Sequence, residues 1–315
     1  RIARAASERD KIAICGYHGW HDWYLSANMN RNNKDGVLKD HLLPGLSTKG
    51  VPSGLKNTVF PFKFNDYDEL ERICDNHKIG VIKMEIFRNY PPKKNFLKKI
   101  RNLASKKNIV LIFDECTSGF RETFGGLHLK YGVLPDICIL GKALGNGFPI
   151  TAVLGKKEIM ENAQTSFISS TFWTDRTGYV AALKTLEIME KTKSWSIISK
   201  KGKVIKNKIH NICKDINLDV EITGLDACPI YTLNIDKKEN WLKYKTFITQ
   251  ELLKNKILGS NVTYVSTSHL DNKINYYLEK LNNILNKINK IRNNQVDIDN
   301  FLEQGVCHSG FKRLN

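Results

Sequence analysis

Two segments of the chain place a residue capable of chemistry at or just beyond the end of a short apolar run. In residues 108–121, NIVLIFDECTSGFR, five apolar residues lead into Asp114, and in residues 136–150, DICILGKALGNGFPI, a similar run leads into Lys142 and a glycine-rich stretch. Short apolar runs predict buried strands, and ligands bind beyond the carboxyl ends of strands in open α/β sheets. We therefore expect an acid and an amine at the same rim of one sheet.

The chemistry that suits this pair is that of pyridoxal 5'-phosphate (PLP). A lysine amine that loses its proton in a partly desolvated site can form a Schiff base with a carbonyl carbon. An aspartate can keep a pyridine nitrogen protonated, so that the ring absorbs the electrons of a substrate carbanion. Taken alone, Asp114 fits a helix cap and Lys142 fits an exposed surface residue. Taken together, they predict that Lys142 carries the cofactor and that Asp114 holds its ring nitrogen.

The elements that would position these residues follow from the hydrophobic pattern. In the first two-thirds of the chain, short apolar runs alternate with helical patterns, which indicates an α/β domain with a mostly parallel sheet. The spacing of Phe96, Ile100 and Leu103 predicts a crossover helix over residues 95–106. The expected strands cover residues 11–15, 80–84, 109–113, 137–140 and 151–154.

The last third of the chain predicts a smaller second domain. A helix beginning at Gly178 leads into a basic, apolar-periodic stretch that ends near residue 212. Further on come strand material broken at Gly224 and Pro229, a helical pattern over 243–256, and a long amphipathic helix over 270–291. We assign residues 1–205 to a large domain and residues 206–315 to a C-terminal small domain.

Composition excludes several classes of function. The net charge of +17 comes from lysines scattered over polar helix faces, so we expect solvated faces rather than a nucleic-acid site. Because no apolar run approaches the roughly 20 residues that span a bilayer, we expect no membrane segment. The seven cysteines form no CxxC pair and no zinc-binding spacing, which fits a reducing cytoplasm and no metal site.

The chain resembles the class-III PLP-dependent aminotransferases of fold type I, and among them the glutamate-1-semialdehyde 2,1-aminomutases. Besides the Asp114 and Lys142 segments, the resemblance rests on residues 15–23, CGYHGWHDW, residues 81–92, VIKMEIFRNYPP, and, more loosely, residues 169–178, SSTFWTDRTG. It implies a large domain with a mostly parallel sheet and a smaller C-terminal α+β domain. It also implies bound PLP, a homodimer, and a small-molecule amino donor and carbonyl acceptor.

The resemblance assigns roles to three residues that would surround the cofactor ring. It implies that Tyr17 stacks on the ring, which adds contact area and fixes its tilt. For His18 it leaves two roles open, positioning the site or bonding the backbone of its own turn. Cys116 stands where the family commonly has valine, and we expect it to pack beneath the ring as a small hydrophobe. Arg121 matches an arginine that organises the rim of the site.

Two further cofactor contacts lie in segments that depart from the family. Glu85 matches a glutamate near the phenolic side of the cofactor, although a plain strand-end ion pair is also possible, and Ile86 replaces the proline that usually follows. Thr171 matches a threonine that reaches the cofactor phosphate across a dimer interface. The bulky residues 172–175 after it differ from the small stretch usual in the aminomutases.

These observations predict a transaminase that moves an amino group to or from a carbonyl substrate through a Lys142 Schiff base. The departures at Ile86 and residues 172–175 favour a specialised substrate, such as a sugar in amino-sugar or surface-polysaccharide synthesis. One alternative is a glutamate-1-semialdehyde 2,1-aminomutase of the tetrapyrrole pathway. Another is a truncated, non-catalytic remnant, because the family's phosphate-binding loop is expected just before Arg1, where the sequence begins in a helical pattern.

Overall fold

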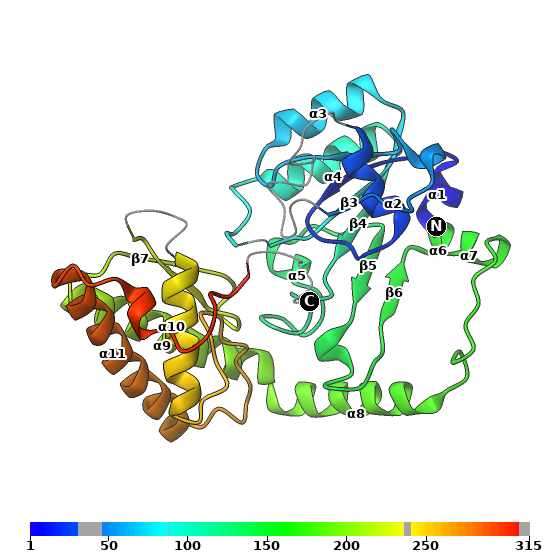
Figure 1. Cartoon of the computed structure of the whole chain (residues 1–315). Coiled ribbons are helices and arrows are strands. Elements are labelled where there is room, and N and C mark those ends of the chain that lie inside the picture. The colour runs from blue at the N-terminus through cyan, green and yellow to red at the C-terminus, as the bar shows by residue number, and fades with distance from the viewer. Residues whose placement is uncertain (31–45, 88, 236–240, 309–315) are drawn as a thin grey trace. The chain divides into compact units, whose positions relative to one another are not determined.

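The computed structural model describes residues 1–30, 46–87, 89–235 and 241–308 (Figure 1). The chain divides into two compact units, residues 1–192 and residues 193–315. The predicted domain boundary between residues 205 and 206 falls inside helix α9 (Ser194–Asp215), the first helix of the second unit.

The first unit is built around one six-stranded sheet. The strands, in their order across the sheet, are β2 (Val59–Pro61), β1 (Lys11–Cys15), β3 (Ile79–Met84), β4 (Val110–Asp114), β5 (Ile137–Leu140) and β6 (Ala152–Gly155). All neighbours run parallel except β5 and β6, which are antiparallel. The five predicted strands are confirmed, each to within one residue at either end. The mostly parallel sheet of the predicted fold class is also confirmed.

Helices cover both faces of this sheet because its strands are apolar on both sides. Along β1, Ile12 and Ile14 belong to the buried cluster that includes Ala3 of α1 (Ile2–Ser7). Figure 1 shows α3 (Tyr67–Asn76) and α4 (Phe96–Lys106) on the other side, with the predicted face of α4 buried. The remaining short helical segments of this unit are α2 (Asp22–Leu25), α5 (His128–Tyr131), α6 (Lys157–Met160) and α7 (Asn162–Thr165), with 3-10 turns η1 (Ser26–Asn30), η2 (Ser53–Leu55) and η3 (Lys142–Leu144).

The first unit ends in α8 (Arg176–Thr192), the helix predicted from Gly178. The second unit contains α9, an antiparallel hairpin of β7 (Val220–Thr223) and β8 (Ile230–Leu233), α10 (Trp241–Lys254), α11 (Asp271–Asn293) and the 3-10 turn η5 (Ile298–Phe301). The apolar periodicity predicted for α11 is confirmed by its buried residues, which share one core with α9 and α10. Across the described parts of both units, no helix is long and apolar enough to cross a membrane.

Candidate active site

Asp114 and Lys142 lie at the ends of two neighbouring parallel strands. Asp114 is the last residue of β4, where it pairs with Ile139 of β5. Strand β5 ends at Leu140, and Lys142 opens the 3-10 turn η3 that follows. Because β4 and β5 run parallel, both residues lie at the carboxyl edge of the sheet, as the sequence predicted.

The backbone at Lys142 is held in an uncommon conformation. Its φ of 48° lies in the left-handed region, which costs a non-glycine residue on the order of 1 kcal/mol. The preceding residue has little room, because a Cβ on Gly141 would lie 3.2 Å from both Cys116 Sγ and Thr151 Cγ2. The close packing around η3 therefore restrains the direction in which the lysine side chain leaves the strand.

The Lys142 amine reaches the turn that follows β4. Its Nζ donates to Thr117 Oγ1 at 2.6 Å, and the side chain is exposed. The carbonyl oxygen of Thr117 accepts a hydrogen bond from Arg121 Nε at 3.4 Å. The amine is therefore ordered by a neutral hydroxyl and is accessible to a ligand.

The Asp114 carboxylate receives its two strong donors on one oxygen. His18 Nδ1 lies 3.0 Å and Lys83 Nζ 3.2 Å from Oδ2, whereas Oδ1 has a 3.4 Å contact with the backbone amide of Cys116. Burial by itself would raise the pKa of this carboxyl, but the His18 hydrogen bond and the Lys83 charge hold the pKa well below its usual range. Asp114 is therefore ionised at neutral pH, with Oδ1 as its less occupied oxygen.

His18 contacts the Asp114 carboxylate. Its side chain is fully buried, its Nδ1 meets the Asp114 carboxylate, and its Nε2 has no hydrogen-bond partner among the described residues. Burial lowers the pKa of the imidazole below its ordinary value, against the opposing effect of the Asp114 hydrogen bond. The ring is thus neutral at pH 7, and the hydrogen-bond network assigns its proton to Nδ1, the donor to Asp114.

Glu85 holds the turn that carries Tyr17. Its Oε2 accepts the backbone N–H of Tyr17 at 3.3 Å. A Cβ on Gly16, whose φ is +113°, would collide with the same carboxylate, so this position requires glycine. The Tyr17 ring packs edge-on against Trp20 and Tyr24, and its hydroxyl is buried without a partner in the described chain. Glu85 therefore connects the segment 81–92 to the segment 15–23.

Cys116 and Thr171 have different surroundings. Burial, reinforced by the charge of Asp114, raises the pKa of the Cys116 thiol to about 11, so the thiol is protonated at neutral pH and suits a packing role. The charge of Lys142 opposes this shift, which places Cys116 near both charged residues of the site. Thr171 lies in an exposed turn just before α8. The hydrogen bonds that connect the other site residues do not include it.

Two anchoring residues, Lys83 and Glu115, were not predicted from the sequence. Lys83 is a charged residue inside the apolar run VIKM, a signal that could have marked it. Glu115 is completely buried and accepts hydrogen bonds from Ser118 Oγ, from the backbone amides of Leu127 and His128, and from His128 Nδ1. Glu115 directly follows Asp114 in the chain, but its partners Leu127 and His128 lie in a later turn.

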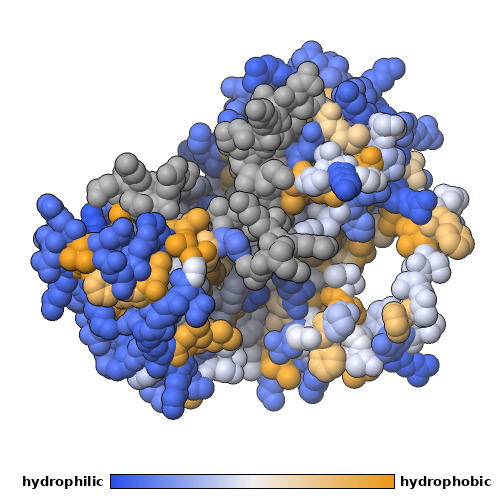
Figure 2. Space-filling view, in the orientation of Figure 1, coloured by the Kyte–Doolittle hydropathy of each residue, from blue (hydrophilic) through white to orange (hydrophobic). Residues whose placement is uncertain are grey.

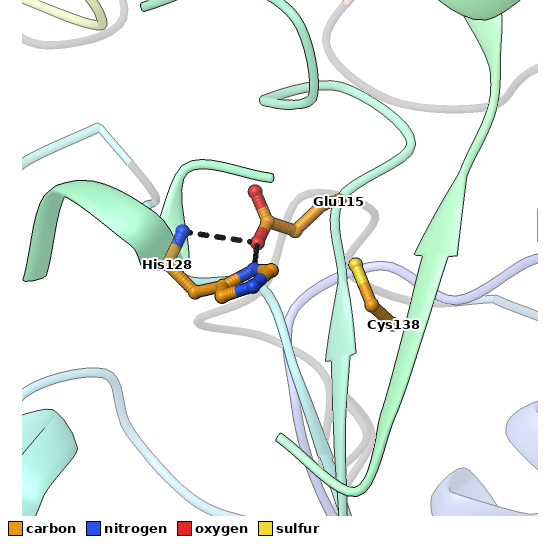
Figure 3. Close-up of side chains that lie close together, drawn as sticks. All are labelled: Glu115, His128 and Cys138. Carbon is orange, nitrogen blue, oxygen red and sulfur yellow. Dashed lines mark hydrogen bonds and ion pairs between the residues drawn. The ribbon is translucent and has the colours of Figure 1, made fainter. Parts of the chain in front are cut away.

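Glu115, His128 and Cys138 lie close together beneath this rim (Figure 3), with one ligand atom of each within 4.8 Å of the others. The Glu115 oxygens are already occupied by protein donors. Burial raises the pKa of the Cys138 thiol to about 12, which disfavours the thiolate that binds metals. The geometry is that of a structural anchor for the turn after β4.

The residues at the rim fit PLP. An ionised carboxylate with an available oxygen suits a protonated ring nitrogen, and an accessible amine lies at the end of the adjacent strand. Two buried polar atoms of the first unit, Tyr17 Oη and His18 Nε2, have no hydrogen-bond partner within the described parts of the chain. Such orphaned atoms often mark a place where a ligand or water completes the hydrogen bonding.

Comparison with known proteins agrees with this geometry. Residues 89–291 match the model of the class-III aminotransferase family. The chain belongs to this family. The predicted resemblance is thereby confirmed. Among curated class-III relatives, the 3-aminobutyryl-CoA aminotransferase of Cloacimonas acidaminovorans is 31% identical over 89% of this chain and 66% of its own length. The glutamate-1-semialdehyde 2,1-aminomutase of Sulfurisphaera tokodaii is 33% identical over 76% of this chain.

This class-III chain spans 66% and 58% of the lengths of those two relatives. Among solved structures, the PLP form of the FumI protein of Sphingopyxis sp. MTA144 has a TM-score of 0.80 over 93% of this chain, at 19% identity. An omega-transaminase from Sphaerobacter thermophilus has a TM-score of 0.78 over 90% of this chain, at 21% identity. The predicted fold type I class is confirmed.

Proposed function

We propose that this protein is a PLP-dependent transaminase that moves an amino group to or from a small carbonyl substrate. The observation that carries the proposal is the rim itself, where the ionised Asp114 and the accessible Lys142 end two adjacent parallel strands. Membership of the class-III family and the aminotransferase name of a relative that aligns with 89% of the chain support it.

PLP, when bound, supplies an electron sink for a carbanion at the substrate. Lys142 would hold the cofactor through its amine, and the same amine, once free, would move a proton at the substrate carbon as a general acid and base. Asp114 would keep the ring nitrogen protonated, and His18 holds the Asp114 carboxylate in place. Tyr17 would provide a flat surface for the ring, and the protonated thiol of Cys116 would pack against it.

Glu85 contributes to this site by holding the Tyr17 turn, and Thr171 would bind the cofactor phosphate of a second subunit. The exposed position of Thr171 just before α8 is compatible with that role. The functional unit is therefore a homodimer. All seven cysteines are free thiols, which supports a reducing, cytoplasmic location.

The substrate we propose is a specialised carbonyl compound, such as a sugar intermediate of surface-polysaccharide synthesis. Phe172 and Trp173 are exposed in the turn that contains Thr171, and such rings would reshape the entrance of a site built across two subunits. The aminomutase reaction is the second candidate, because the Sulfurisphaera tokodaii relative carries that name. The two reactions differ in their need for an amino donor. A transaminase forms product only when both donor and acceptor are supplied, whereas an aminomutase converts a single substrate.

The assignment of Lys142 is tested with PLP and borohydride. We expect PLP to produce a yellow absorbance and borohydride to fix it covalently to the peptide that contains residue 142, as mass spectrometry reads out. The variant K142A loses the adduct, whereas K130A, which removes an exposed lysine paired with Glu122, keeps it. An adduct at one other lysine in K142A would refute the assignment. A wild-type protein with no chromophore would favour the non-catalytic remnant.

A further inference from the structure

Lys83 occupies an unusual place for a lysine. It lies in β3, between Ile14 of β1 and Ile112 of β4, and its side chain is only 14% exposed. A cation buried among apolar strands is costly unless it is paired. Two partners meet it, the Asp114 carboxylate at 3.2 Å and the ring of Trp23, whose centroid lies 5.4 Å from Nζ. Asp114 lies at the carboxyl edge described above, so Lys83 belongs to the site.

The way Lys83 pairs with Asp114 is informative. Lys83 and His18 both bind Oδ2, so the carboxylate is held from one side by two donors. Oδ1 is left with a long contact to the Cys116 amide. A permanent positive charge also offsets part of the charge that Asp114 presents to any group bound at Oδ1. A neutral donor such as His18 orients the carboxylate without offsetting its negative charge.

We propose that Lys83 is a positioning residue that holds Asp114 by Oδ2, leaves Oδ1 for the cofactor's ring nitrogen, and moderates the basicity of that nitrogen. The statements about the cofactor's ring nitrogen rest on the proposed function. The contacts of Lys83 and His18 with Asp114 are a property of the cofactor-free protein. Removing the positive charge of Lys83 should raise the pKa of any basic group that lies near Asp114, because a cation would no longer repel the added proton. His18 is one such group, and the ring nitrogen of a bound pyridine is the other.

The first experiment uses the cofactor-free protein and follows the His18 imidazole by NMR as a function of pH. The groups that face His18 are Lys83 of β3, Asp114 of β4, Glu85 beyond β3 and the Tyr24 ring of α2. We expect Lys83→Met to shift the pKa of His18 upward and Lys83→Arg to restore it toward the wild-type value. A matched control is Lys99→Met, which removes an exposed lysine that also lies over an aromatic ring, that of Tyr67 at 5.1 Å.

The second experiment uses pyridoxine 5'-phosphate, which has no carbonyl group and binds without reacting. Its ultraviolet absorption reports the protonation of the ring nitrogen, and we expect K83M to move that pKa upward relative to wild type and K99M. If the probe does not bind the wild-type protein, the proposed function fails while the His18 experiment still stands. If K83M titrates like K99M in both experiments, the proposal for Lys83 is wrong.

A third measurement does not require K83M to fold. An ion-paired, buried lysine ammonium exchanges its protons with water slowly, so NMR should detect the Lys83 ammonium in the wild-type protein. We expect the signal to disappear in Asp114→Asn, which removes the anionic partner. A Lys83 ammonium that exchanges rapidly in the wild-type protein, or equally slowly in both proteins, would overturn the ion pair and with it the proposal.

Discussion

Each residue around Asp114 offsets a cost of burying its charge. A carboxylate removed from water is unfavourable unless it accepts good hydrogen bonds, and here one neutral and one cationic donor share a single oxygen. The neutral donor, His18, is itself buried, and burial lowers the pKa of its imidazole. The folded protein therefore keeps this ring neutral at a pH where the unfolded chain binds a proton.

This difference predicts how pH acts on stability through His18. Below about pH 6.5, the pKa of an unfolded histidine, the unfolded state takes up a proton that the folded state does not, so stability is lost as the pH falls. The variant His18→Asn keeps a donor for Asp114 but cannot titrate. We expect its free energy of unfolding in urea to fall less steeply than that of the wild type between about pH 7 and about pH 5.

The control for this titration is His210→Asn, which removes an exposed histidine of the second unit. It should keep the pH dependence of the wild type. Equal slopes for the wild type and H18N would mean that His18 is not held neutral in the folded protein.

The turn after β4 is the element that aligns the two charged residues. Glu115 fastens it at both ends, because its carboxylate joins Ser118 near the start to the amides of Leu127 and His128 at the far end. Thr117, which receives the Lys142 amine, lies within the fastened segment. A buried carboxylate thus gives an irregular segment the rigidity that a strand would otherwise supply.

Substitution of this anchor should destabilise the first unit. Glu115→Gln places an NH₂ group where one of several backbone and side-chain donors now points, leaving a buried donor unsatisfied, and we expect a loss of about 1–3 kcal/mol in the free energy of unfolding. Urea denaturation followed by circular dichroism measures it. The matched change Glu187→Gln affects an exposed ion pair with Lys184 and should alter stability little. Similar midpoints for the two variants would contradict the anchoring role.

At the scale of the whole molecule, the notable surface lies along α8. Figure 2 shows apolar residues among the polar ones there. Val180 and Leu183 are 63% and 69% exposed on this helix, and Phe172 and Trp173 are exposed in the turn before it. Clustered apolar side chains on a surface mark an interaction site more often than scattered ones do. This surface continues from Thr171, the residue expected to serve a second subunit, so a second copy of the chain is the occupant that we expect.

The double variant V180D/L183D tests this surface. Light scattering of the wild-type protein should give twice the chain mass of 36.0 kDa, and the double variant should give the mass of one chain because two charges would be buried in the interface. Leu258→Asp, at a 95% exposed residue of the second unit, serves as the control and should stay dimeric. A monomeric wild type, or a dimeric V180D/L183D, would exclude α8 as the subunit interface.

Local sequence determined a large part of this protein. Strands β1, β3, β4 and β5 come from short, mostly apolar runs, and the face of α4 is an apolar spacing of three and four, so these elements follow from patterns within a few residues. Asp114 and Lys142 could be identified because Asp114 directly follows the run 109–113 and Lys142 follows the run 137–140 after a single glycine. Strand β2 was not predicted, because it has only three residues, one of them a proline, and so is too short to show a strand pattern.

Only the tertiary structure decided how the site is held together. His18 and Asp114 are 96 residues apart in the chain, and Glu115 meets its partners across a turn whose path no periodicity specifies. Lys83 stands out in its strand, but the sequence could not say that it shares an oxygen of Asp114 with His18. Local periodicity determines which face of a strand is buried, whereas the choice of partner for a buried charge depends on which strands become neighbours when the sheet forms.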